Sequence, residues 1–313
     1  VAVIASVLNG QGGFMEAVSK MAQIPSDVPA TMGQPGAFTS FFGPDPLNLL
    51  GVVILTSLGT WGLPQMIGKF YAIKDEKSIN TGTVISTLFA IVISGGCYFL
   101  GGFGRLFDSA EIYNAETGAV VYDSIIPSML SKLPDILIGI VVVLVLSASM
   151  STLSSLVLTS SSTMTLDLLK DNIMKEMSEK KQIITMQILI VFFIVVSVVI
   201  ALDPPTFIAQ LMGISWGALA GAFLAPFLYG LYWKGVTRAG VWAGFIAGVG
   251  ITVSNMFIGY IASPINAGAA AMVAGLVIVP LVSLVTPKLK KEDVDEIFTC
   301  YEEKVVSTKK RNL

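Results

Sequence analysis

Hydroxyl side chains are concentrated in one apolar stretch of this sequence. Twelve of the nineteen residues at 147–165 are serine or threonine. At helical spacing, one face carries a row of small or hydroxyl residues: Ala148, Ser151, Thr152, Ser155, Thr159 and Ser162. A lipid bilayer offers no hydrogen-bond partner, so each hydroxyl needs one in the protein or in a ligand. A neutral, oxygen-rich face at membrane depth suits a small hard cation such as Na⁺.

The same hydroxyls have a structural interpretation. Serine and threonine in membrane helices often bond back to the carbonyl four residues earlier, or let helices approach closely. We expect this role for Ser154, Ser160 and Ser161, which lie off the main face. The density of hydroxyls on the main face favours a ligand there.

A second candidate lies at residues 56–65, in the middle of an apolar span. Gly59, Gly62 and Pro64 weaken the helix, because glycine is flexible and proline removes a backbone donor. Transporters use such mid-membrane breaks to bind solutes and ions through exposed backbone groups. An ordinary proline kink is an equally good interpretation of the local sequence. Trp61 lies deeper than the interfacial zone where tryptophan collects.

A third group of small residues lies at 213–222 and includes Gly213, Gly217 and Gly221. Small residues at such spacing let membrane helices pack closely. We therefore predict a packing surface here, and no ligand site.

The composition is that of a polytopic membrane protein. Of 313 residues, 54% are hydrophobic and 13% charged, against about a quarter charged in soluble domains. The net charge of -2 suggests no nucleic-acid partner. Histidine is absent, which removes the commonest general base and transition-metal ligand. Cys97 and Cys300 are far apart and suggest neither a disulfide framework nor a zinc site.

Charged residues avoid the middle of every predicted span. Proton-coupled carriers normally place a titratable group at depth, so coupling to sodium through neutral oxygens is the simpler hypothesis. An intramembrane enzyme would need a cluster of reactive groups, and Cys97 is alone at depth. We therefore expect no catalytic activity.

Seven stretches are long and apolar enough to cross a bilayer: about 46–71, 82–103, 136–168, 183–201, 206–232, 238–261 and 264–286. The third is long enough to tilt or to project beyond the membrane. Residues 1–10 resemble the end of a truncated transmembrane helix, since no basic region precedes the apolar run and no cleavage site follows. We expect the chain to lack its natural N-terminus.

Lysine and arginine predict the orientation. With alternate loops on opposite sides, all but three of the 19 basic residues fall on one side; the exceptions are Lys20, Arg105 and Lys132. The predicted cytoplasmic segments are 72–81, 169–182, 233–237 and the tail at 288–313. The predicted external segments are 11–45, 104–135 and 202–205. The mixed charges of the tail are typical of solvated surface.

Several of these segments resemble one family. Residues 61–65 (WGLPQ) are followed by 69–72 (KFYA), and residues 149–155 (SMSTLSS) by 161–170 (SSTMTLDLLK). Together they resemble the sodium/solute symporter family, in particular its proline and pantothenate branches. The resemblance extends over nearly the whole chain.

The resemblance implies an all-α integral membrane fold of two inverted five-helix repeats, like that of amino-acid transporters. Residues 46–232 would form the second repeat, and 233–287 two peripheral transmembrane helices. Residues 1–10 would end the first repeat, whose other helices would lie upstream.

The resemblance also implies two sites. It assigns Na⁺ to the carbonyl of Ala148 and the hydroxyls of Ser151 and Thr152, with further ligands from upstream. It assigns the solute to the broken helix: Thr56, Ser57, Thr60, Trp61 and Pro64.

The implied function is Na⁺-coupled symport of a small organic solute in the plasma membrane. The solute would be an amino acid such as proline or an organic acid such as pantothenate. The chain departs from the proline branch at Thr56 and Thr60, where that branch has bulky aromatics, and from the pantothenate branch at Gln65, where that branch has histidine. The alternative is a transporter-like receptor that binds a solute without moving it.

Overall fold

The computed structural model describes residues 1–70, 73–107, 109, 112–115, 118, 120–299 and 301. Over these residues the structure is helical, and its one β feature is an isolated bridge between Tyr113 and Val120. Among the described residues, six helices are long and apolar enough to cross a membrane, and a bent helix pair makes a seventh candidate. This confirms the all-α membrane class. Cys300 and residues 302–313 of the predicted tail lie outside the described residues.

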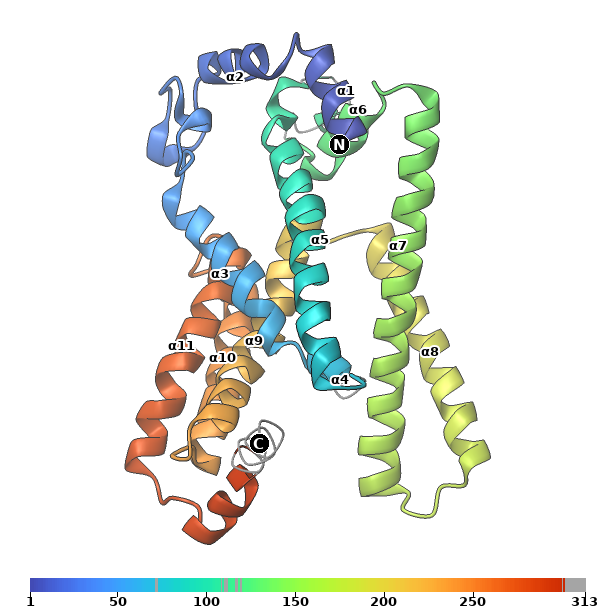
Figure 1. Ribbon diagram of the computed structural model, residues 1–313, viewed down its shortest axis with the longest axis vertical. Coiled ribbons are helices and arrows are strands. Elements are labelled where there is room, and N and C mark those ends of the chain that lie inside the picture. The colour runs from blue at the N-terminus through green and yellow to red at the C-terminus, as the bar shows by residue number, and fades with distance from the viewer. Residues whose placement is uncertain are drawn as a thin grey trace, which may run out of the picture. The chain divides into compact units, whose positions relative to one another are not determined.

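The long helices closely follow the predicted spans (Figure 1): α3 (Pro46–Gly62), α4 (Pro64–Phe70), α5 (Glu76–Gly102), α7 (Asp135–Ser162), α8 (Glu179–Leu202), α9 (Ile208–Tyr232), α10 (Arg238–Ile258) and α11 (Pro264–Val285). The span predicted at 46–71 is two helices, and the span predicted at 136–168 continues as a π-helix, η5 (Thr163–Ile173). Helix α10 ends earlier than predicted because Gly259, with φ at 69°, adopts the left-handed conformation. Its N–H bonds the Asn255 carbonyl.

The chain divides into two compact units: residues 1–44 with 73–207, and residues 45–72 with 208–313. The first unit contains α5, α7 and α8. It also holds the shorter elements α1 (Ala2–Gly10), α2 (Phe14–Gln23), η1 (Pro29–Thr31), η2 (Ala37–Thr39), η3 (Gly104–Leu106) and α6 (Tyr122–Leu130).

Small apolar clusters hold the short elements of the first unit together. One cluster joins Val7 of α1 to Met129 of α6, and another joins Met21 of α2 to Phe103. Arg105 lies over the Phe38 ring, 4.0 Å from its centroid, and pairs with Asp27 at 3.0 Å. Helices α7 and α8 lie side by side as an antiparallel pair (Figure 1).

The second unit is a bundle of α3, α9, α10 and α11 in which glycines face one another. A Cβ on Gly217 would lie 2.5 Å from the Cα of Gly268, and one on Gly221 3.0 Å from the Cβ of Ala271. Lipid provides no hydrophobic force between helices, so close backbone approach is what stabilises the bundle. Helix α9 is continuous through Gly213, and a Cβ on Gly213 would lie 2.9 Å from the Cα of Ile265 in α11, which confirms the predicted packing surface.

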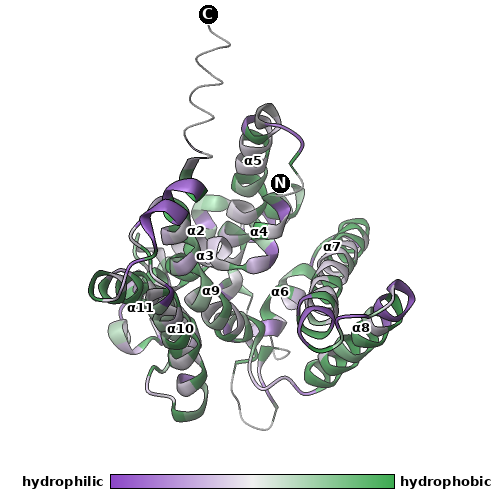
Figure 2. Cartoon of the chain, turned by 90° about the horizontal axis from the view of Figure 1, so that it is seen from below, coloured by the Kyte–Doolittle hydropathy of each residue, from purple (hydrophilic) through white to green (hydrophobic). Residues whose placement is uncertain are grey.

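Hydrophobic residues cover the long helices on most sides. Figure 2 shows apolar colouring along α8 and polar colouring at the connection between α7 and α8. No residue of α8 is buried within the chain. A helix that is apolar all round suits a lipid environment or further helices as neighbours.

Candidate functional site

The predicted break in the helix at residues 56–65 is present. Helix α3 ends at Gly62, α4 begins at Pro64, and their axes differ by 51°. Leu63 between them is extended, with φ -82° and ψ 118°, and is 1% exposed. Pro64 has no N–H, so the Thr60 carbonyl lacks the helical donor that residue 64 would otherwise supply. The break therefore leaves backbone oxygens available to a ligand.

Packing against α9 holds this break in place. A Cβ on Gly62 would lie 2.8 Å from both the Cα of Ala220 and the Cβ of Leu224. A Cβ on Gly59 would lie 3.2 Å from the indole of Trp216. The two glycines therefore allow α3 to approach α9 more closely than any larger residue would permit.

The predicted solute-binding residues differ in their hydrogen bonds and in their exposure. The Thr56 hydroxyl donates to the Val52 carbonyl at 2.8 Å, and the Thr60 hydroxyl donates to the Ser57 carbonyl at 3.1 Å. Both oxygens can still accept a hydrogen bond from a ligand. Trp61 is 59% exposed.

A groove of about 660 Å³ lies beside the break. Its lining residues come from α3, α4 and the end of α9: Thr60, Trp61, Met66, Ile67, Lys69, Phe70, Phe227, Leu228, Leu231 and Tyr232. The volume is typical of small-molecule sites. Of the predicted solute residues, Thr60 and Trp61 line it, whereas Thr56, Ser57 and Pro64 do not. The wall from α9 was missed because its residues are typical of any transmembrane span.

Helix α7 places the predicted sodium ligands on an open face. Ala148, Ser151 and Thr152 are all exposed within this chain. In contrast, the Ser154 hydroxyl donates to the Met150 carbonyl at 2.7 Å, as expected of a packing residue.

One residue of the predicted ligand face behaves differently. The Thr159 hydroxyl bonds back to the Ser155 carbonyl at 2.8 Å. The hydroxyls of Ser151 and Thr152 make no side-chain hydrogen bond to any residue that the structure describes. The same holds for the hydroxyls of Ser155 and Ser162, so four of the five hydroxyls on the predicted face are unengaged among the described residues.

The chemistry of these oxygens suits Na⁺. Two neutral hydroxyls and the second lone pair of the Ala148 carbonyl are hard ligands without charge. Hard cations commonly take about six oxygens, so one helical turn supplies only part of a coordination shell. In the described ranges, no group of three or more histidine, cysteine, aspartate or glutamate residues is placed to bind a metal.

Two further hydroxyls of this helical region are buried. Ser161 and Thr165, one turn apart, are both 0% exposed, and neither has a hydrogen-bond partner within the described structure. Ser161 was expected to have a packing role, and its burial agrees with that expectation. Thr165 lies in η5, and π-helical segments are frequent at functional sites.

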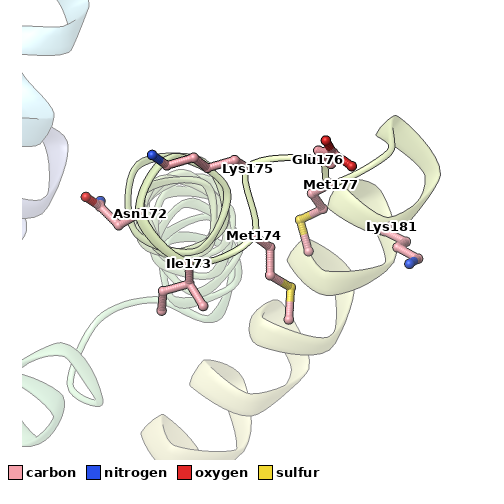
Figure 3. Close-up of a pocket in the computed structure, with 7 residues that line it drawn as sticks. All are labelled: Asn172, Ile173, Met174, Lys175, Glu176, Met177 and Lys181. Carbon is pink, nitrogen blue, oxygen red and sulfur yellow. The ribbon is translucent and has the colours of Figure 1, made fainter.

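A second pocket lies where η5 connects to α8. It has a volume of about 500 Å³ and is lined by residues 172–177 and Lys181. Figure 3 shows Met174 and Met177 between the two helices, with Asn172 on the far side of η5 and the Lys175 side chain extending across it. This open, mixed-charge pocket lies in the connection predicted to face the cytoplasm.

Comparison with known proteins identifies the family. The model of the sodium:solute symporter family matches residues 1–248, which include both the broken helix and the hydroxyl-rich helix. The chain belongs to the sodium:solute symporter family. It is 31% identical over 241 residues to a sodium/pantothenate symporter of Haemophilus influenzae, covering 76% of this chain and 47% of that protein.

A second relative is a sodium/proline symporter of Staphylococcus aureus. The identity is 28% over 258 residues, which cover 79% of this chain and 49% of that protein. This symporter-family chain therefore spans about half the length of the curated relatives it matches.

Proposed function

We propose that this chain forms part of a secondary active transporter that couples Na⁺ influx to uptake of a small organic solute. The observation that carries the proposal is the break at Leu63. It leaves backbone oxygens free beside an apolar groove, and tight packing against α9 stabilises it.

In this proposal Na⁺ binds to the carbonyl of Ala148 and the hydroxyls of Ser151 and Thr152. Their neutrality supports the assignment, because Na⁺ can leave such a site without a carboxylate to hold it back. The remaining ligands would come from residues outside this helical turn.

The solute would bind at the broken helix through Thr56, Ser57, Thr60, Trp61 and Pro64. Its class would be an organic acid such as pantothenate or an amino acid such as proline, because relatives with those names match most of the chain. The aromatic ring of Trp61 would contact the apolar part of the solute, while hydroxyl and backbone groups bind its polar part.

We also propose the topology implied by the sequence. Residues 46–232 would form the second five-helix repeat and 233–287 two peripheral helices, with the C-terminus in the cytoplasm. The distribution of lysine and arginine among the loops supports this orientation.

Coupling would follow from linkage. If bound Na⁺ stabilises the conformation that binds the solute, the solute must raise the affinity for Na⁺ by the same factor. Neither site needs to touch the other for this reciprocity to hold.

The decisive experiment uses the complete transporter in proteoliposomes. A Na⁺ gradient should drive accumulation of labelled pantothenate or proline, and unlabelled solute inside should accelerate labelled counterflow. A receptor would bind the solute in a Na⁺-dependent manner but show no counterflow. That result would contradict the proposal.

A further inference from the structure

A short helix near the C-terminus packs against the connection between α9 and α10. Residues 291–299 are helical. The Lys234 ammonium lies 2.7 Å from the Asp295 carboxylate and 5.4 Å from the centroid of the Phe298 ring. A cation placed between a carboxylate and an aromatic face makes two favourable contacts at once.

A third contact continues along the same side. The Tyr301 hydroxyl donates to the Leu231 carbonyl at 3.1 Å. Leu231 lies in the last turn of α9, where carbonyls lack helical donors, so this bond satisfies an otherwise free acceptor. The ring of Tyr301 also packs on Phe298, with centroids 5.7 Å apart.

These contacts recur every three residues, at Asp295, Phe298 and Tyr301, which places them along one side of the segment. Glu296 is exposed and belongs to no ion pair between described residues. The contact surface is therefore specific to one face of the helix.

The contacts reach the groove beside the broken helix. Leu231, whose carbonyl Tyr301 binds, lines that groove together with Tyr232 and Trp61. The segment thus holds the end of α9 that forms one wall of the groove.

We propose that residues 291–299 and Tyr301 form a C-terminal latch, which restrains the end of α9 while docked on Lys234 and Leu231 and lets this wall of the groove move when it detaches. The regulatory role of the latch rests on the proposed transport function, whereas the docking of the segment on α9 does not. Release of the solute from the groove would be slower with the latch docked.

The latch is weak enough to open. The side chains of Lys234 and Asp295 are 49% and 46% exposed, and exposed ion pairs add little stability. Losing the pair should therefore change the docked fraction about two- to fivefold. High salt should have a similar effect.

The first test measures docking in the complete transporter, in which Cys97 and Cys300 are replaced and Leu228→Cys, at a partly buried position of the groove wall, reports access to the groove. A membrane-impermeant maleimide is applied to the cytoplasmic face. Asp295→Lys should raise the labelling rate about two- to fivefold. The charge swap Lys234→Asp with Asp295→Lys should restore the slow rate, and Glu296→Lys, the matched control, should leave it unchanged. Equal labelling of all variants would overturn the latch.

The second test measures solute efflux from loaded proteoliposomes. It uses the same variants of Asp295, Lys234 and Glu296, but without the reporter cysteine. Efflux should rise with Asp295→Lys and return with the charge swap. If labelling responds and efflux does not, the regulatory role is overturned. If transport shows no Na⁺ dependence while labelling still responds, the proposed function fails and the docking stands.

Discussion

Helices α7 and α3 differ in how much of each helix is buried and in whether the helix is continuous. Along the 28 residues of α7, only Val157 and Ser161 are buried. In the 17 residues of α3, Gly51, Leu55, Gly59 and Gly62 are buried, and the helix is broken at its end. A continuous helix can present oxygens on an open face without help, whereas a broken helix needs tight packing to stay broken.

The two helices also differ in which of their hydroxyls bond back to their own helix. In α3, Thr56 and Thr60 bond back to their own helix near the break. In α7, the hydroxyls of Ser154 and Thr159 do the same, while those of Ser151 and Thr152 remain available. A count of hydroxyls therefore overstates the number that can bind an ion, because those that bond back to their own helix are already engaged.

The strongest test of the open face of α7 is Thr152→Ala in the complete transporter. Loss of one oxygen ligand to a charged group costs about 1.5–3 kcal/mol, so half-maximal uptake should need about 10- to 100-fold more Na⁺. Ser154→Ala, whose hydroxyl is already bonded to the Met150 carbonyl, is the matched control and should change little. An unaltered sodium curve for Thr152→Ala would remove this residue from the site.

Glycine-to-alanine substitutions compare the packing of the two helices directly. Gly62→Ala would force a methyl group against the backbone of Ala220 and should destabilise the chain by about 1–3 kcal/mol. A Cβ on Gly139 in α7 would meet nothing within 4 Å. Gly139→Ala should therefore raise the free energy of unfolding by about 0.5–1 kcal/mol through helix propensity. Thermal unfolding in detergent measures both. Equal destabilisation would mean that α7 is as tightly packed as α3.

A smaller effect should distinguish bonds between helices from bonds within one. The Tyr229 hydroxyl of α9 donates to the Leu276 carbonyl of α11 at 2.8 Å, so Tyr229→Phe should cost about 1 kcal/mol. Thr159→Val in α7 loses a bond only to its own helix and should cost less. Chemical denaturation of the two variants tests this order, and a larger loss for Thr159→Val would reverse it.

The smallest effect is expected from the exposed ion pair of the first unit. A hydrogen bond from Arg105 lowers the pKa of Asp27 below its usual 3.8. A lowered pKa gives stability that is present above about pH 4 and is lost as the pH falls through the pKa of the folded state. Because the pair is exposed, Asp27→Asn should cost less than about 1 kcal/mol at pH 7.

The pH dependence supplies the control for that variant. The difference in unfolding free energy between Asp27→Asn and the unsubstituted chain should stay constant from about pH 5 to 8 and vanish in stronger acid. A difference that grows on acidification would contradict the pairing. Added salt should reduce it at neutral pH.

The sequence was sufficient for the class of protein and for nearly every span. These features depend on stretches of about 20 residues whose hydropathy is set locally. The break near Leu63 could also be predicted from the sequence, because Gly62 and Pro64 act on their own helix. The size of the bend could not be predicted, since the single span predicted at 46–71 is two helices whose axes differ by 51°.

Contacts between distant segments decided the rest. Leu231 and Tyr232 line a groove with Trp61, although about 170 residues separate them in the chain, and Tyr301 reaches the Leu231 carbonyl from beyond α11. Helical periodicity places a side chain on a face, but it does not say which other helix that face meets. The sequence alone thus determined the helices and their chemical faces, and tertiary packing decided which faces form a site.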